Sequence, residues 1–224
     1  MLRTEGFRLS TDSVLLGNFI NLTGAKKGLD LGCASGILAL LLLSLKDGLH
    51  MTGVEINGEE CECAQQNMTI NGLSERSSIV CADLRNYREL FPAGSFDVIV
   101  SNPPYFPVGS GDASPDAGRA RARGELSCTL EDICSASEYL CRWGGKVAFV
   151  HKPERLSELL VAMHAHGIEA KRLRLVSHGA QSAPSLILVE GKRGAAPGLK
   201  IEKPLILTNS DGTDSEEIKR IYHR

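Results

Sequence analysis

Short apolar runs that are typical of strands alternate along the chain with longer segments of helical composition. The pattern predicts strands near residues 28–32, 51–56, 78–83, 96–101, 146–150, 172–176 and 186–190. It predicts helices near residues 37–46, 58–71, 129–142 and 154–166, with stop signals at Asn71-Gly72, Gly144-Gly145 and Gly167. Strands that alternate with helices form parallel sheets covered on both faces, so we expect an α/β fold.

The length predicts a single domain, over residues 1–194. A chain of 224 residues is long enough for one domain with a large core and short for two α/β domains. Residues 107–118, rich in Gly, Ser, Asp and Ala, indicate a mobile loop, and residues 195–224 indicate a tail packed on the same domain. The sequence leaves open whether that loop becomes ordered on binding a substrate, and what the oligomeric state is.

Composition and charge exclude several classes of protein. No apolar run reaches the roughly 18 residues of a membrane span, and residues 1–6 contain no apolar signal region, so we expect a cytoplasmic protein with no membrane partner. The cysteines are scattered, and the close pair Cys61 and Cys63 lacks zinc-site spacing, so we expect free thiols and no metal. A net charge of −2 is unlike that of a protein that coats DNA, although it does not exclude a local basic patch.

A glycine turn follows the first predicted strand, in the segment Asp30-Leu31-Gly32-Cys33-Ala34-Ser35-Gly36. Gly32 permits a tight turn, and Gly36 lets the backbone approach a ligand closely. A dinucleotide-binding fingerprint would place further glycines at the positions of Ala34 and Ile37, so the segment gives little support for a pyrophosphate site. S-adenosylmethionine contains no phosphate and does not need a pyrophosphate-binding turn. A plain turn without a ligand is the alternative.

Acidic residues stand at the carboxyl ends of three consecutive predicted strands, the edge of a parallel sheet where ligands bind. Asp30 can meet the ammonium group of S-adenosylmethionine, Glu55 the two ribose hydroxyls, and Asp83 the adenine amino group, with an apolar neighbour against the ring. Each acid alone could be a solvated strand cap, but together they predict a cofactor site. Its candidate residues are Asp30, Gly32, Cys33, Ala34, Gly36, Glu55, Ile56, Asp83, Leu84 and Asn102.

The fourth predicted strand ends at Asn102-Pro103-Pro104-Tyr105, the most specific motif in the chain. The lone pair of an aromatic amine is delocalised, and acceptors on its hydrogens favour the reactive, pyramidal nitrogen. The Asn102 side-chain oxygen and the Pro103 carbonyl can be these acceptors. The prolines stiffen the turn, and Tyr105 offers a face for a planar substrate. We expect these four residues to be catalytic, with in-line displacement driven by positioning; a plain proline turn is the alternative.

These motifs resemble those of class I S-adenosylmethionine-dependent methyltransferases that methylate amines. The segment at residues 6–16, from Gly6-Phe7 to Leu15-Leu16, resembles more narrowly the entry motif of the bacterial tRNA1(Val) (adenine-N6)-methyltransferase family. Further similarities lie at residues 114–116, 125–126, 129–132 and 152–156, and in Arg119 and Arg123. This chain has Ala34 where the family commonly has a glycine and Gly124 where it commonly has a histidine.

The resemblance implies a Rossmann-like sheet of seven strands, mostly parallel with an antiparallel last strand and helices on both faces. It implies that residues 1–24, with Thr11 and Asp12, close over the methionine end of the cofactor. It also implies a tRNA partner, methylated on N6 of an adenosine next to the anticodon. Arg119 and Arg123 are candidates for holding RNA phosphates, whereas the basic run at residues 171–174 indicates a solvated face.

Two other functions remain open from the sequence. The Asn-Pro-Pro-Tyr motif is shared with enzymes that methylate a protein glutamine on N5, so a protein could be the acceptor. A module that binds S-adenosylmethionine and RNA without chemistry is the second alternative, against which the intact motif argues. The four histidines His151, His164, His166 and His178 form no recognisable ligand set.

Overall fold

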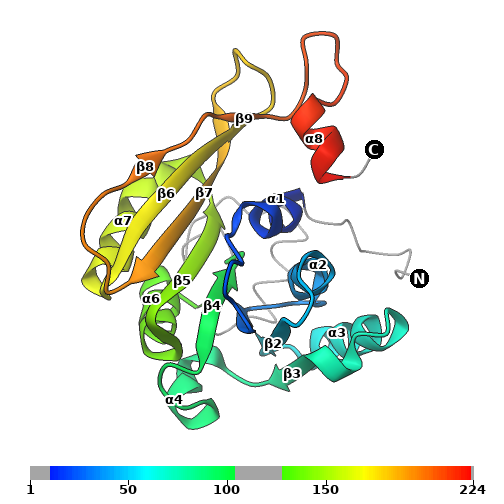
Figure 1. Ribbon diagram of the computed structural model, residues 1–224, viewed down its shortest axis with the longest axis vertical. Helices are drawn as coiled ribbons and strands as arrows, with labels where there is room; N and C mark the ends of the chain where they lie inside the picture. Colours follow the sequence, from blue (N-terminus) through cyan, green and yellow to red (C-terminus); the bar gives the residue numbers. More distant parts are fainter. Residues whose placement is uncertain (1–10, 104–127, 223–224) are drawn as a thin grey trace, which may run out of the picture.

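The computed structural model of this protein describes residues 11–103 and 128–222. In this part of the chain one sheet runs through the molecule, in the order β3-β2-β1-β4-β5-β7-β6-β8, and β9 also pairs with β6 (Figure 1). Its strands are β1 (Lys27–Leu31), β2 (His50–Glu55), β3 (Ser77–Cys81), β4 (Phe96–Ser101), β5 (Cys141–His151), β6 (Ile168–Ser177), β7 (Pro184–Arg193), β8 (Lys200–Ile201) and β9 (Leu205–Ile206). The α-helices are α1 (Thr11–Phe19), α2 (Ile37–Leu45), α3 (Gly58–Ile70), α4 (Tyr87–Leu90), α6 (Leu130–Leu140), α7 (Leu156–Ala165) and α8 (Glu216–Ile221).

The strand directions confirm the expected fold. The pairs β3–β2, β2–β1, β1–β4 and β4–β5 are parallel, and β7 is antiparallel to both of its neighbours, β5 and β6. The count of seven strands needs one correction, because the two-residue strands β8 and β9 add to the edge beside β6. Both lie within residues 195–224, the segment that the sequence analysis expects to be a tail packed on the same domain.

Side chains that alternate between the two faces of the strands build a hydrophobic core on each face of the sheet. Ala148 and Val150 of β5 join one buried cluster, and Val147 and Phe149 join the other. Helices α1, α2 and α8 cover the first face, and α6 and α7 cover the second (Figure 1). Leu205 and Ile218, from the last part of the chain, are buried in the first cluster. None of the described helices is long and apolar enough to cross a membrane.

The start of β5 differs from the prediction. The expected helix over residues 129–142 begins with a capping box at Thr129 and Asp132 but ends at Leu140. The glycines expected to follow it lie inside β5, which pairs with β4 from Cys141 onward through an irregular register. A Cβ atom on Gly145 would lie 2.9 Å from the Asp97 carbonyl oxygen, so this close strand approach needs a glycine.

Candidate active site

Parallel register brings the predicted site residues to one edge of the sheet. Asp30 on β1 is level with Gly53 of β2 and with Val100 of β4. Glu55 and Asn102 each lie two residues further along their chains, at the carboxyl ends of β2 and β4. Glu55 is in turn level with Cys81, the last residue of β3, and Asp83 follows it. The edge therefore carries four polar side chains from four adjacent strands.

The glycine turn at residues 32–36 is held in left-handed backbone conformations. The φ angles are +74° at Gly32, +45° at Ala34 and +80° at Gly36, and a positive φ is unusual for alanine. A Cβ atom on Gly36 would lie 3.2 Å from the Cβ atom of Ala64 on α3. The buried Asn67 of α3 donates from Nδ2 to the Ser35 carbonyl oxygen over 2.9 Å, which ties the turn to that helix.

Asp30 is a buried carboxyl group beneath this turn. It is 1% exposed, and its Oδ2 has no hydrogen-bond partner among the described residues. Burial, and after it the negative charge of Glu55, raise the pKa of Asp30 to about 7 against the opposing effect of a hydrogen bond from the Ala39 backbone. Because a buried polar atom is ordinarily satisfied, this oxygen is suited to a cationic or hydrogen-bonding ligand.

Glu55 joins the end of β2 to the glycine turn. Its Oε2 accepts a hydrogen bond from the Ala34 N–H over 3.0 Å, and its Oε1 accepts from the N–H groups of Ile56 and Asn57, each over 2.9 Å. Ile56 is 47% exposed, which leaves an apolar side chain open beside the carboxylate. The pair offers a planar organic ligand both a charged acceptor and an apolar surface.

Asp83 has a partner that the sequence analysis missed. Its Oδ1 accepts a hydrogen bond from the Arg85 backbone N–H. Both carboxylate oxygens also accept hydrogen bonds from the Arg85 guanidinium, over 2.5 to 3.0 Å. The Arg85 side chain lowers the pKa of Asp83. Leu84, the apolar neighbour, is half-buried against the core. A ligand that uses Asp83 must share its carboxylate with Arg85.

Asn102 and Pro103 follow β4 directly. The Asn102 Nδ2 donates to Ser13 Oγ of α1 over 3.2 Å, and Pro103 is buried. The neighbouring Ser101 donates from Oγ to the Leu31 carbonyl oxygen over 2.7 Å, which fixes the end of β4 to the end of β1. The remaining predicted substrate residues, Pro104, Tyr105, Arg119 and Arg123, lie outside the described residues, as does the loop 107–118.

Comparison with known proteins decides the family. Residues 8–115 match the family described as Methyltransferase small domain. A Tolumonas auensis protein named tRNA1(Val) (adenine(37)-N6)-methyltransferase is 32% identical over 94% of this chain and 86% of its own length. A Porphyromonas gingivalis protein of the same name is 33% identical over 82% of this chain and 73% of its own length. This chain belongs to the family of these methyltransferases.

Solved structures agree with the methyltransferase fold. A structure described as a predicted O-methyltransferase, Atu636 from Agrobacterium tumefaciens, covers 95% of each chain with a TM-score of 0.78 and 18% identity. A geranyl diphosphate methyltransferase in complex with S-adenosylmethionine covers 81% of this chain and 84% of its own, with a TM-score of 0.59 and 13% identity. At these identities the likeness concerns the fold alone. The expected enzyme class and the cofactor, S-adenosylmethionine, are confirmed by the family.

The described residues of this methyltransferase fit that cofactor. The buried Asp30 Oδ2 would meet its ammonium group, and the turn at Gly32 to Gly36 would take its methionine part. Glu55 would accept from the ribose, with Ile56, Leu84 and Asp83 around the adenine. Cys33 contributes little polarity, because its buried thiol has a strongly raised pKa from burial. On α1, Thr11 is exposed and Asp12 half-buried.

Several residues of the methyltransferase that sequence reasoning missed lie at or near this edge. Ser13, Ser101 and Asn67 hold segments of the candidate site through hydrogen bonds to distant parts of the chain. The buried His151 ends β5 beside β4, and its Nδ1 accepts the Lys152 N–H over 2.7 Å. Burial lowers the pKa of His151 to about 4, so the ring is neutral at pH 7. No sequence spacing points to these residues, since their partners are remote.

The basic run at residues 171–174 is structural. Arg172 pairs with Glu190 and Glu202, and Arg174 pairs with Glu217 of α8. The expectation of a solvated face is therefore wrong for these two arginines, because acidic side chains from later segments fold onto them. Within residues 11–103 and 128–222, no group of three His, Cys, Asp or Glu side chains could hold a metal ion.

Proposed function

We propose that this methyltransferase transfers the methyl group of S-adenosylmethionine to N6 of an adenosine next to the anticodon of a tRNA. The observation that carries the proposal is the place of Asn102 and Pro103. They follow β4 at the same sheet edge as Asp30 and Glu55, in an enzyme whose relatives are named tRNA1(Val) (adenine(37)-N6)-methyltransferases. A transferable methyl group and an acceptor site for an amine would thus lie side by side.

The bound cofactor supplies a methyl group on a sulfonium, which is a good leaving group. Asn102 Oδ1 and the Pro103 carbonyl would accept the two hydrogens of the adenine amine and so localise the nitrogen lone pair. The Asn102 amide is held before a substrate arrives, because its Nδ2 donates a hydrogen bond to Ser13 Oγ, and the adjacent Pro103 is buried. The released proton can pass to water, since the methylated amine is acidic at that stage.

The roles of the other predicted residues belong to this proposal. We assign Asp30 to the cofactor's ammonium group, Glu55 to its ribose, and Asp83 with Leu84 to its adenine. We assign residues 1–24, with Thr11 and Asp12, to closing over the methionine end. Residues 195–224 would complete the single domain, to which Leu205 and Ile218 contribute buried side chains.

The deciding experiment measures methyl transfer from labelled S-adenosylmethionine to bulk unmodified tRNA, followed by nucleoside analysis. N6-methyladenosine in the product supports the proposal. No label in RNA, from a protein that binds the cofactor, overturns it; label in a protein glutamine from a cell extract would then identify the other acceptor of this motif.

The Asn102→Ala variant tests the chemistry at that site. It should lose turnover by at least about a hundredfold, the usual cost of removing one such hydrogen-bonding group. The Kd for S-adenosylmethionine should change little, because the acceptors act on the substrate amine. Transfer at the parental rate would contradict the role of Asn102, and a large loss of cofactor affinity would indicate a binding role instead.

A further inference from the structure

The Asn102 amide is oriented by a residue from the other end of the sequence. Its Nδ2 donates to Ser13 Oγ over 3.2 Å, between residues 89 positions apart. Ser13 itself is 8% exposed, so water has little access to this hydrogen bond. The nitrogen and oxygen of a side-chain amide lie in one plane on the same carbon, so a fixed Nδ2 also fixes the direction of Oδ1. Ser13 thereby sets where the acceptor oxygen of the proposed reaction points.

Helix α1 transmits position along its length. Ser13 and Phe19 lie six residues apart on this helix, which corresponds to about 9 Å at about 1.5 Å per residue. Val14, Leu15 and Leu16 are each no more than 5% exposed and pack in the core. A packed helix of this kind moves as a unit, so the place of its Phe19 end determines the place of Ser13.

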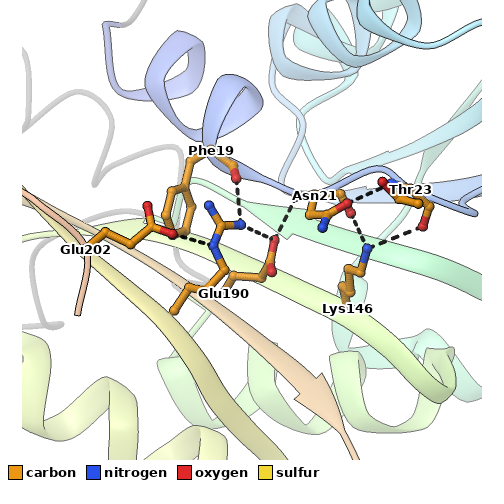
Figure 2. Close-up of polar contacts among 7 residues, drawn as sticks. Phe19, Asn21, Thr23, Lys146, Glu190 and Glu202 are labelled. Carbon is orange, nitrogen blue, oxygen red and sulfur yellow. Dashed lines mark hydrogen bonds and ion pairs between the residues drawn. The ribbon is translucent and has the colours of Figure 1, made fainter. Parts of the chain in front are cut away.

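A polar cluster around the buried Glu190 holds the Phe19 end, and Figure 2 shows its contacts. Glu190 of β7 is 5% exposed, and its Oε2 accepts from the Asn21 N–H over 2.7 Å and from Arg172 over 3.0 Å. Arg172 also donates to the Phe19 carbonyl oxygen over 3.1 Å, and its guanidinium carbon lies 4.3 Å from the centre of the Phe19 ring. One ion pair thus binds both the last residue of the helix and the segment after it.

Further contacts complete the cluster (Figure 2). Lys146 of β5 donates to the carbonyl oxygens of Asn21 and Thr23 over 2.7 and 3.3 Å, and Arg172 Nε donates to Glu202 over 2.8 Å. The two cations stand at the carboxyl end of α1, where the helix dipole favours positive charge. Partly buried ion pairs such as Arg172–Glu190 and Arg172–Glu202 add little net stability compared with apolar packing. Their effect here is to place backbone groups at defined positions.

We propose that α1 positions the methyl acceptor: Ser13 at one end orients the Asn102 amide, and the Glu190–Arg172 pair at the other end holds the helix where Ser13 can do so. Ser13, Glu190 and Arg172 are positioning residues in this scheme, not catalytic ones. The inference rests on the proposed role of Asn102 as an acceptor for the substrate amine.

The first test replaces Ser13 in the full chain. Ser13→Ala should lower kcat about fivefold to tenfold, the equivalent of one hydrogen bond, and leave the Kd for S-adenosylmethionine within about twofold. Ser13→Thr keeps the hydroxyl and should recover most of the rate. A Ser13→Ala variant with wild-type kcat would overturn the proposal, and so would equal losses in the Ala and Thr variants.

The second test asks whether the two ends of α1 act through one route. Glu190→Ala should lower kcat, Glu190→Gln should restore part of the rate, and the Ser13→Ala/Glu190→Ala double variant should lose less than the product of the single effects. Glu138→Ala is the matched control, because it removes the ion pair that Arg193 of the same strand, β7, makes with α6 over 2.5 Å. This control should keep the parental kcat; independent, multiplicative effects at Ser13 and Glu190 would contradict coupling through α1.

A readout without turnover separates this inference from the proposed function. The ¹H–¹⁵N correlation of the Asn102 side-chain amide can be assigned by its loss in Asn102→Asp. Its protons should exchange with water faster in Ser13→Ala and in Glu190→Ala than in the wild type and Glu138→Ala. Unchanged exchange refutes the positioning role even if tRNA is methylated. Changed exchange in a protein that methylates no tRNA supports the positioning role and refutes only the proposed function.

Discussion

The buried Asp30 makes stability depend on pH in a predictable direction. Its carboxyl titrates near 3.8 in the unfolded chain and near 7 in the folded protein. Because the folded pKa is the higher one, the folded state holds the proton more tightly. The contribution of Asp30 to the free energy of unfolding is therefore fully present below pH 3.8 and is lost as the pH rises to 7. At about 1.36 kcal/mol for each pH unit, the full loss is about 4 kcal/mol.

The Asp30→Asn substitution keeps the size of the side chain and removes its charge at every pH. Urea denaturation of both proteins without cofactor, at pH 5, 6, 7 and 8, gives the free energy of unfolding. The difference, variant minus wild type, should grow by about 2 kcal/mol between pH 5 and 7 and then level off. Comparing the two proteins removes the opposite contribution of His151, whose lowered pKa costs stability as pH falls toward 4.

Two outcomes would refute the reasoning about Asp30. A difference that stays constant from pH 5 to 8 would mean that the carboxyl is not desolvated. Asp47→Asn, at an exposed position, is the control and should show no such growth. The same Asp30→Asn variant should bind S-adenosylmethionine more weakly at pH 8, because the ammonium group loses its partner. Unchanged affinity in calorimetry would exclude Asp30 from the cofactor site.

Two further predictions concern the glycine turn and its partner. Ala34→Gly should raise the free energy of unfolding by about 1 kcal/mol, because the relief of alanine's strain at a φ of +45° exceeds the entropy that glycine adds to the unfolded chain. Denaturation midpoints measure this change, and a destabilised variant would contradict the strain. Glu55→Gln should raise the Kd for S-adenosylmethionine about tenfold, because the ribose loses its charged acceptor. Calorimetry measures this Kd, and an unchanged value would mean that Glu55 only holds the backbone of Ala34 and its neighbours.

The sheet edge could be predicted because parallel topology follows from local patterns. Once the apolar runs are strands joined by helices, the carboxyl ends that carry Asp30, Glu55 and Asn102 must meet. The turn between β1 and α2 is equally local, since its glycines precede the apolar helix directly. The assignment of those residues to cofactor and substrate then depended on their chemistry and on the family resemblance, which no hydrophobic pattern supplies.

Helix α1 shows what the pattern could not reveal. Its residues from Ser13 to Gly17 are all buried, so the helix has no alternation of polar and apolar faces to mark it. The residues that hold the helix and the segment after it, Asn102, Arg172 and Glu190, come from distant parts of the sequence. For the same reason Arg172 resembled a solvated strand residue: the charges that it neutralises lie 18 and 30 positions later in the chain.

Two buried acidic residues illustrate how structure separates an anchor from a ligand-binding group. Glu190 is 5% exposed, and its Oε2 accepts hydrogen bonds from both Arg172 and the Asn21 N–H, so its charge is paired within the chain. Asp30 is 1% exposed, yet its Oδ2 finds no partner within the described chain, and its pKa is raised to about 7. A folded protein ordinarily avoids such a cost. A bound cation would offset it, which supports our proposal that Asp30 meets the ammonium group of the cofactor while Glu190 helps to hold α1.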